Sequence, residues 1–154
     1  MSVVIASDIH GSAYYCEKLL ALYREIGAER LFLLGDILYH GPRNALPEGY
    51  APAKVVEALS PFAEKITAVR GNCDAEIDDA VLPFDLLTPE KRAEYGGKLI
   101  LLTHGHRISF REPPEENVMR ETDLVFFGHS HVPFFGKIGK NPDSRLKNPS
   151  GVLF

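Results

Sequence analysis

The chain of 154 residues has no tryptophan and only two cysteines, and none of its apolar runs is long enough to cross a membrane. The cysteines, Cys16 and Cys73, lie in unrelated local contexts, so a disulfide framework is not expected. The residues before Asp8 lack the basic stretch and long apolar segment of a signal peptide. From these absences we predict a cytoplasmic protein that has no membrane partner.

An excess of positive charge is also missing. Lysine and arginine number 17 against 21 aspartates and glutamates, which gives a formal net charge of −4 and a pI near 5.9. A general nucleic-acid binder gains affinity from a basic face, so this balance argues against nucleic acid as a partner. The length suits one domain, and we predict a single domain over residues 1–154 with no internal repeat.

Five short apolar runs are each followed by a polar cluster rich in glycine. These runs are residues 3–6, 31–34, 66–69, 99–102 and 124–127. Continuous apolar runs of four residues bounded by glycine predict strands that are buried on both faces. Each polar cluster follows the carboxyl end of its strand, where ligands bind in parallel sheets. We therefore expect the polar clusters to meet at one edge of one sheet.

Helical patterns separate the first three of these runs. Apolar spacing predicts a helix over residues 12–26, with Ser12 as its N-cap and Gly27 as its end. A second short helix is expected over residues 53–62, so the strands should be parallel with right-handed crossovers. Residues 37–52 are rich in glycine and proline, and we predict a functional loop there. Two or three strands within residues 80–102, turning at Gly96-Gly97, and a short helix over 115–122 complete the prediction.

The polar clusters contain the side chains that bind divalent metals. In chain order they are Asp8-x-His10, Gly35-Asp36, Gly71-Asn72-Cys73-Asp74, His104-Gly105-His106 and Gly128-His129-Ser130-His131. Each motif is weak alone and more often marks a turn, but carboxylates and imidazoles gathered at one edge repel or desolvate one another unless a cation binds them. Two dications would balance two aspartates with charge to spare for a phosphate. Imidazole, carboxylate and amide ligands suit manganese, iron, cobalt or zinc.

These five motifs, in this order, resemble the calcineurin-like metallophosphoesterase superfamily, and the block of residues 35–57 is similar to its small bacterial YfcE-type phosphodiesterases. The resemblance implies an α/β fold, a metallophosphoesterase-type β-sandwich of two mixed sheets flanked by helices. It also implies two divalent metal ions, with manganese expected and phosphodiesters as substrates. The roles it implies are a first metal on Asp8, His10 and His131, a second on Asn72, His104 and His129, and Asp36 bridging both.

One departure from the superfamily pattern affects the chemistry. Many members have histidine where this chain has Cys73, so a strong imidazole acid is missing there, and we expect better turnover of esters with good leaving groups. A small residue packed beside the metals is the simpler interpretation of Cys73, with substrate contact as the alternative. Arg43 could bind phosphate oxygens. His106 either assists catalysis or caps a loop, and Asp74 orients a ligand or caps the turn.

The sequence thus predicts a metal-dependent phosphodiesterase in which a hydroxide bridging the metals attacks a small phosphodiester, with Asp36, Asn72 and His106 as catalytic residues. The alternatives are a phosphomonoesterase acting on a nucleotide or small metabolite, then a nuclease, and, from another class, a Vps29-like protein-binding scaffold. Retention of every metal ligand argues against the scaffold. A homo-oligomer formed through residues 134–135 stays open.

Overall fold

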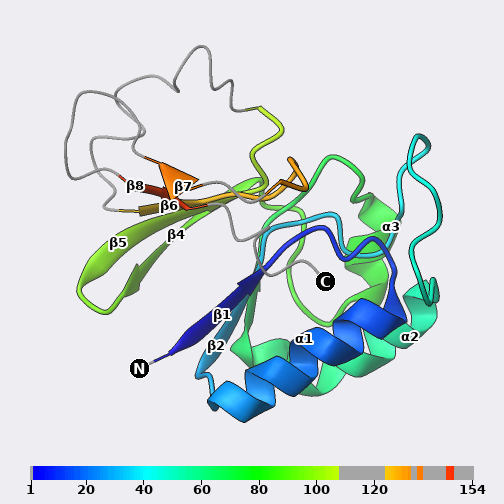
Figure 1. The fold of residues 1–154 in the computed structure, drawn as a ribbon, viewed down its shortest axis with the longest axis horizontal. Helices are drawn as coiled ribbons and strands as arrows, with labels where there is room; N and C mark the ends of the chain where they lie inside the picture. Colours follow the sequence, from blue (N-terminus) through cyan, green and yellow to red (C-terminus); the bar gives the residue numbers. More distant parts are fainter. Residues whose placement is uncertain (1, 108–123, 133–134, 137–144, 148–154) are drawn as a thin grey trace.

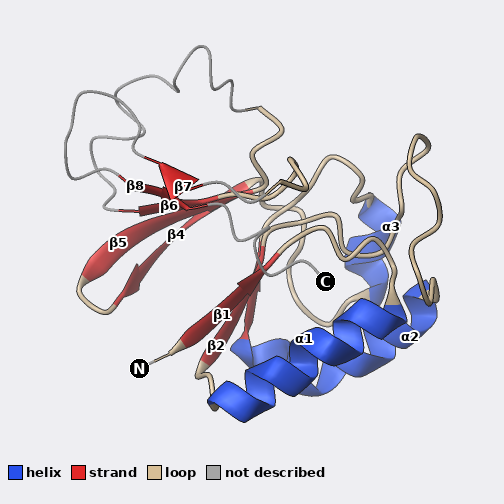
Figure 2. Ribbon diagram, viewed as in Figure 1, coloured by secondary structure: helices blue, strands red, loops and turns tan. Residues whose placement is uncertain are grey.

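The computed structural model describes residues 2–107, 124–132, 135–136 and 145–147, which form two sheets with helices packed against one of them (Figures 1 and 2). The described helices are α1 (Ala13–Ile26), α2 (Pro52–Leu59) and α3 (Glu76–Val81), and a 3-10 helix, η1 (Ser60–Lys65), continues α2. The first sheet has the order β1 (Val3–Ala6), β2 (Arg30–Leu33) and β3 (Ile66–Ala68). The second has the order β4 (Glu90–Tyr95), β5 (Lys98–Thr103), β6 (Leu124–Phe126), β8 (Arg145–Lys147) and β7 (Phe135–Gly136).

The first sheet is buried on both faces, as its continuous apolar strands predict. Alternate residues along β2 and the residue after it point to opposite faces. Leu31 and Leu33 pack in the core on the helix side. Phe32 and the following Leu34 pack in a second core that includes residues of the second sheet. All three strands run parallel. The sheet is therefore the middle layer of the molecule, and its strand ends are fixed from both sides.

Helix α1 begins and ends where the sequence indicates. The Ser12 hydroxyl accepts a hydrogen bond from the backbone N–H of Tyr15 at 3.1 Å, and Gly27 ends the helix in the left-handed conformation at φ +64°. Helix α3 was not predicted, because six residues are too few to show helical periodicity. Its start is fixed by the Asp78 carboxylate, which accepts a hydrogen bond from the N–H of Ala75 at 2.8 Å.

The second sheet corrects one expectation. Strands β5 and β6 are parallel to each other but do not join β1, β2 and β3, so the expectation that all five polar clusters follow one sheet is wrong. The predicted turn at Gly96-Gly97 is confirmed, and it joins β4 and β5 in an antiparallel hairpin that belongs to the second sheet. Strands β4 and β5, over residues 90–103, agree with the two or three strands predicted within residues 80–102. The α/β fold with two sheets is confirmed, although mixing occurs only in the second sheet among the described strands.

No helix in the described residues is long and apolar enough to span a membrane. The helix predicted over residues 115–122 and the apolar residue Phe134 lie outside the described residues.

Candidate functional site

The structure brings all seven predicted metal ligands to one place, where the carboxyl ends of β1, β2 and β3 face those of β5 and β6. Backbone conformation helps to direct the side chains. The described non-glycine residues with positive φ are Asp8 (59°), His10 (50°), Asp36 (54°), His129 (67°) and His131 (51°). Non-glycine residues rarely adopt this conformation, which costs about 1–3 kcal/mol each and persists where the surrounding structure requires it. That all five are predicted ligands marks this as a functional site.

The first group of ligands surrounds a buried carboxylate oxygen. Asp8 Oδ1 is inaccessible to solvent and accepts no aligned hydrogen bond from the part of the chain that the structure describes. Nevertheless, the Nε2 atoms of His131, His10 and His104 lie 3.2, 3.7 and 4.0 Å from it. The other oxygen, Oδ2, accepts a hydrogen bond from the backbone N–H of His129 at 2.9 Å. A buried carboxylate oxygen facing three ring nitrogens is an arrangement that could hold a cation.

The second group is centred on His104, which is completely buried. Its Nε2 lies 3.3 Å from Asp36 Oδ2 and 3.0 Å from Asn72 Oδ1. Asp36, His104 and His129 each offer a ligand atom within 4.8 Å of the others, as do Asp8, His10 and His131 in the first group. Asp36 also lies 3.8 Å from His10 Nε2, so its carboxylate reaches both groups.

Backbone carbonyls orient two of the imidazoles. His10 Nδ1 donates to the carbonyl of Tyr39 at 2.8 Å, and His104 Nδ1 donates to the carbonyl of Leu34 at 2.7 Å. A carbonyl oxygen only accepts, so Nδ1 must carry a hydrogen in both rings. In the neutral ring, Nε2 then has a lone pair directed at the other ligands, as metal binding requires.

Asp74 holds the loops that carry Asp36 and Asn72. Its Oδ2 accepts hydrogen bonds from the N–H groups of Asp36 (2.8 Å) and Gly71 (2.7 Å), and its Oδ1 accepts one from Ile37 (2.9 Å). The carboxylate thus ties the loop after β2 to the loop after β3. The prediction was that Asp74 orients a ligand or caps the turn, and its hydrogen bond from Gly71 holds that turn.

The ionisation of the site reflects its crowded charges. Burial alone would raise the pKa of Asp36, but the hydrogen bond and charge of His104, together with the N–H of Cys73 at 2.7 Å, lower it to about 2. Burial opposes protonation of His104, yet the carboxylates of Asp36 and Asp8 raise its pKa. The Asp8 carboxylate, whose Oδ1 lies 3.2 Å from His131 Nε2, raises the pKa of His131. Without a metal, protons on these imidazoles must balance the carboxylates, and bound cations could replace those protons.

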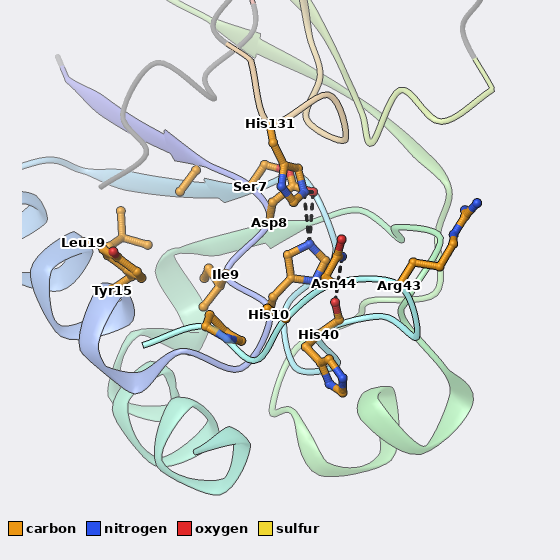
Figure 3. Close-up of a pocket in the computed structure, with 13 residues that line it drawn as sticks. Ser7, Asp8, Ile9, His10, Tyr15, Leu19, His40, Arg43, Asn44 and His131 are labelled. Atoms are coloured by element: carbon orange, nitrogen blue, oxygen red, sulfur yellow. Dashed lines mark hydrogen bonds and ion pairs between the residues drawn. The ribbon is translucent and has the colours of Figure 1, made fainter. Parts of the chain in front are cut away.

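Among the described residues, three cavities border the predicted ligands. The largest, about 620 Å³, is lined by members of both ligand groups together with Arg43, Asn44 and Cys73. A neighbouring cavity of about 500 Å³ is shown in Figure 3, where the guanidinium of Arg43 extends away from His10 and His131. Asn44 donates to the carbonyl of His40 at 2.8 Å, which closes the loop at the cavity wall. The predicted functional loop over residues 37–52 therefore does border the site.

The remaining predicted residues lie at the edge of the ligand cluster. The ring centroid of His106 is 5.4 Å from that of His104 and 6.1 Å from that of His129. Burial and the nearby Asp36 raise the pKa of the Cys73 thiol to about 12, so it stays protonated at neutral pH. Cys16, by contrast, is fully buried in helix packing, as predicted.

Comparison with known proteins identifies the family. A model of the calcineurin-like phosphoesterase superfamily domain matches residues 1–152. The chain belongs to this superfamily. As a calcineurin-like phosphoesterase it is a phosphoric ester hydrolase, and membership in this family of metallophosphoesterases implies divalent metal ions.

Relatives of this calcineurin-like phosphoesterase agree with that placement. The chain is 44% identical to phosphodiesterase YfcE of Escherichia coli K12 over 148 residues, which cover 94% of this chain and 79% of YfcE. A solved structure of E. coli YfcE, described as a phosphoesterase, superimposes with a TM-score of 0.86 at 42% identity, covering 97% and 79% of the two chains. The zinc-bound Vps29 of Entamoeba histolytica shares the fold at 17% identity and a TM-score of 0.62, covering 97% and 73%.

Sequence reasoning missed the groups that hold the ligands in place. The carbonyls of Tyr39 and Leu34 orient imidazoles, but a backbone carbonyl leaves no signal in side-chain identity. Asn44 and the two arginines Arg70 and Arg107 line cavities beside the ligands. In the sequence, the only indication that Asn44, Arg70 and Arg107 border the site is that each lies close to a motif residue.

Proposed function

We propose that this calcineurin-like phosphoesterase is a divalent-metal-dependent phosphodiesterase, with manganese as the expected ion and zinc, iron or cobalt as alternatives. The observation that carries the proposal is the pair of ligand groups that share Asp36 at the wall of one cavity of about 620 Å³. We assign Asp8, His10 and His131 to one ion, Asn72, His104 and His129 to the other, and Asp36 to both. The name of the relative YfcE supports the diester as substrate.

The chain's own residues would prepare the site for hydrolysis. When bound, a metal pair supplies positive charge for the phosphoryl oxygens and activates water for attack. Neutral Asn72 contributes an oxygen without cancelling that charge. Arg43 lines the cavity and is exposed, so its guanidinium can contact phosphate oxygens from the solvent side.

Departure of the alcohol receives little help from acids in this site. Cys73 stands where many relatives have histidine, and its pKa near 12 makes the thiol a poor proton donor. His106 is the remaining candidate acid, because it lies beside His104 and His129 at the cavity edge. Substrates with good leaving groups should therefore react faster.

The test is hydrolysis of bis-p-nitrophenyl phosphate against p-nitrophenyl phosphate by chelator-stripped protein, with manganese, zinc, magnesium or no metal added. We expect metal-dependent turnover that favours the diester. Faster turnover of the monoester would favour the phosphomonoesterase alternative. Tight metal binding with no turnover of either ester would contradict the proposal and favour the Vps29-like scaffold.

A cytoplasmic location stays a prediction.

A further inference from the structure

A third cavity, of about 390 Å³, adjoins the candidate metal site at Asn72, and none of its described lining residues comes from the loop at residues 37–52. It is lined by Arg70, Gly71, Asn72, Leu87, Pro89, His106 and Arg107. Asn72 also lines the 620 Å³ cavity, so the two spaces meet at a proposed metal ligand. A phosphodiester carries two ester-linked alcohol moieties. If its phosphorus atom lay beside Asn72, one moiety could occupy each cavity.

The third cavity is positively charged. Two arginines line it, and no aspartate or glutamate is among its described lining residues. Across the described ranges, neither Arg70 nor Arg107 forms an ion pair with a carboxylate. On a chain with a net charge of −4, two arginines that form no ion pair with a carboxylate of the described ranges, beside the candidate site, indicate an anionic ligand.

Arg70 is held in position for such a ligand. Its backbone N–H donates to the carbonyl of Thr88 at 2.9 Å, and its Nε donates to the carbonyl of Asp74 at 3.2 Å. The Nε bond uses one of the five guanidinium N–H groups and fixes the plane of the side chain. Arg107 is exposed and directly follows His106, and it lines the cavity from the segment after β5, whereas Arg70 lies after β3.

We propose that this cavity is a subsite for a phosphate monoester group carried on one alcohol of the diester, bound by Arg70 and Arg107. The guanidinium matches phosphate oxygens in a two-pronged arrangement that lysine cannot reproduce. The inference rests on the proposed function and narrows its substrate class to diesters with an additional terminal phosphate.

The experiment compares two dinucleotides that differ only in a terminal phosphate, adenylyl-adenosine with and without a 5′-phosphate, at fixed ionic strength. The phosphorylated substrate should have a kcat/KM about tenfold to a hundredfold higher, the range expected for hydrogen bonds to a charged group. Both Arg107→Ala and Arg70→Lys should reduce that preference. The matched control is Arg30→Ala, which removes the same charge at the far end of β2 and should keep the full preference.

Binding to the metal-stripped protein separates this inference from the proposed function. Titration calorimetry with the same two dinucleotides should show tighter binding of the phosphorylated one, and Arg107→Ala should abolish the difference. Turnover without any preference for the terminal phosphate overturns the subsite and leaves the phosphodiesterase standing. A preference that survives both arginine variants also overturns it. If neither dinucleotide is hydrolysed, the affinity ratio alone decides, and equal affinities overturn the subsite.

Discussion

At the scale of single residues, the site is a set of buried charges that needs counter-charge. Asp36 is 2% exposed and contacts a ligand of each group, so it links the two halves of the site. Its carboxylate also accepts the N–H of Cys73. Replacing one oxygen of this carboxylate changes charge and geometry for both halves at once.

Asp36→Asn should therefore lower the affinity for both metal ions and reduce diester hydrolysis by more than about 100-fold, because a shared anionic ligand is lost. Metal content after dialysis, measured by elemental analysis, and turnover of bis-p-nitrophenyl phosphate check this together. Asp85→Asn is the control. Asp85 is an exposed carboxylate outside the ligand cluster, and its Oδ2 lies 2.8 Å from Lys91 Nζ. Wild-type activity in Asp36→Asn would refute the bridging role.

A second prediction at the residue scale concerns Cys73 and protonation of the leaving group. Cys73→His should supply an imidazole acid and raise kcat/KM about tenfold to a hundredfold for esters with poor leaving groups, with less effect on p-nitrophenyl esters. The measurement is the dependence of log kcat/KM on leaving-group pKa, which should become shallower. Cys73→Ser is the matched control, because serine keeps the size without adding an acid. An unchanged slope in Cys73→His would mean that the proton comes from elsewhere.

At the scale of elements, loops from different strands are tied together before any metal binds. The Asp74 carboxylate connects the loop after β2 with the loop after β3 through three backbone N–H groups. The two loops also pass so closely that a Cβ on Gly71 would overlap the Asp36 carboxylate, which explains the glycine there. The strand ends position the loops, and Asp74 keeps them in contact.

Asp74→Ala should lower the free energy of unfolding by about 3 kcal/mol, since it leaves three buried N–H groups without an acceptor. Denaturant unfolding of the stripped protein measures this loss. Asp74→Asn, which keeps one acceptor oxygen, should fall between Asp74→Ala and the wild type. If Asp74→Ala is as stable as the wild type, the carboxylate does not hold these loops.

At the scale of the whole molecule, the two-sheet architecture brings carboxylates and imidazoles into contact. The end of a single strand could not supply both sets of side chains. Carboxylates come from the first sheet, and His104, His129 and His131 come from the second. The stability of the molecule should therefore depend on protons when metal is absent and on metal when it is present.

The pH dependence of the stripped protein follows from the pKa shifts. The pKa values of His104 and His131 are raised, so their stabilisation is complete below the ordinary value of 6.5 and is lost as pH rises through the folded values. The pKa of Asp36 is lowered from 3.8 to about 2, so its stabilisation is present above 3.8 and is lost as pH falls toward 2. The stripped protein should be most stable between about pH 4 and 6.5.

Thermal unfolding from pH 3 to 9, with and without manganese, checks this prediction. Added metal should raise the melting temperature most at neutral and higher pH, because metal replaces the imidazole protons that are missing there. A stripped protein whose stability rises steadily from pH 5 to 8 would contradict the expected balance of charges.

The sequence by itself determined the local features of this protein. The apolar runs of β1, β2 and β3 require burial on both faces, Ser12 and Gly27 set the ends of α1, and the motif spacing supplies the ligand types. Each of these depends on neighbouring residues in the chain, which is why it could be predicted.

Only the tertiary structure decided which sheet each strand joins and which of the predicted ligands lie close together. Strand pairing depends on packing between segments far apart in sequence. A polar cluster at the carboxyl end of a strand therefore does not reveal which strands lie beside that strand. The carbonyls of Tyr39 and Leu34 orient His10 and His104 only because the folded chain brings them within 2.8 Å. Backbone groups are the same at every position, and only the fold selects which of them a side chain meets.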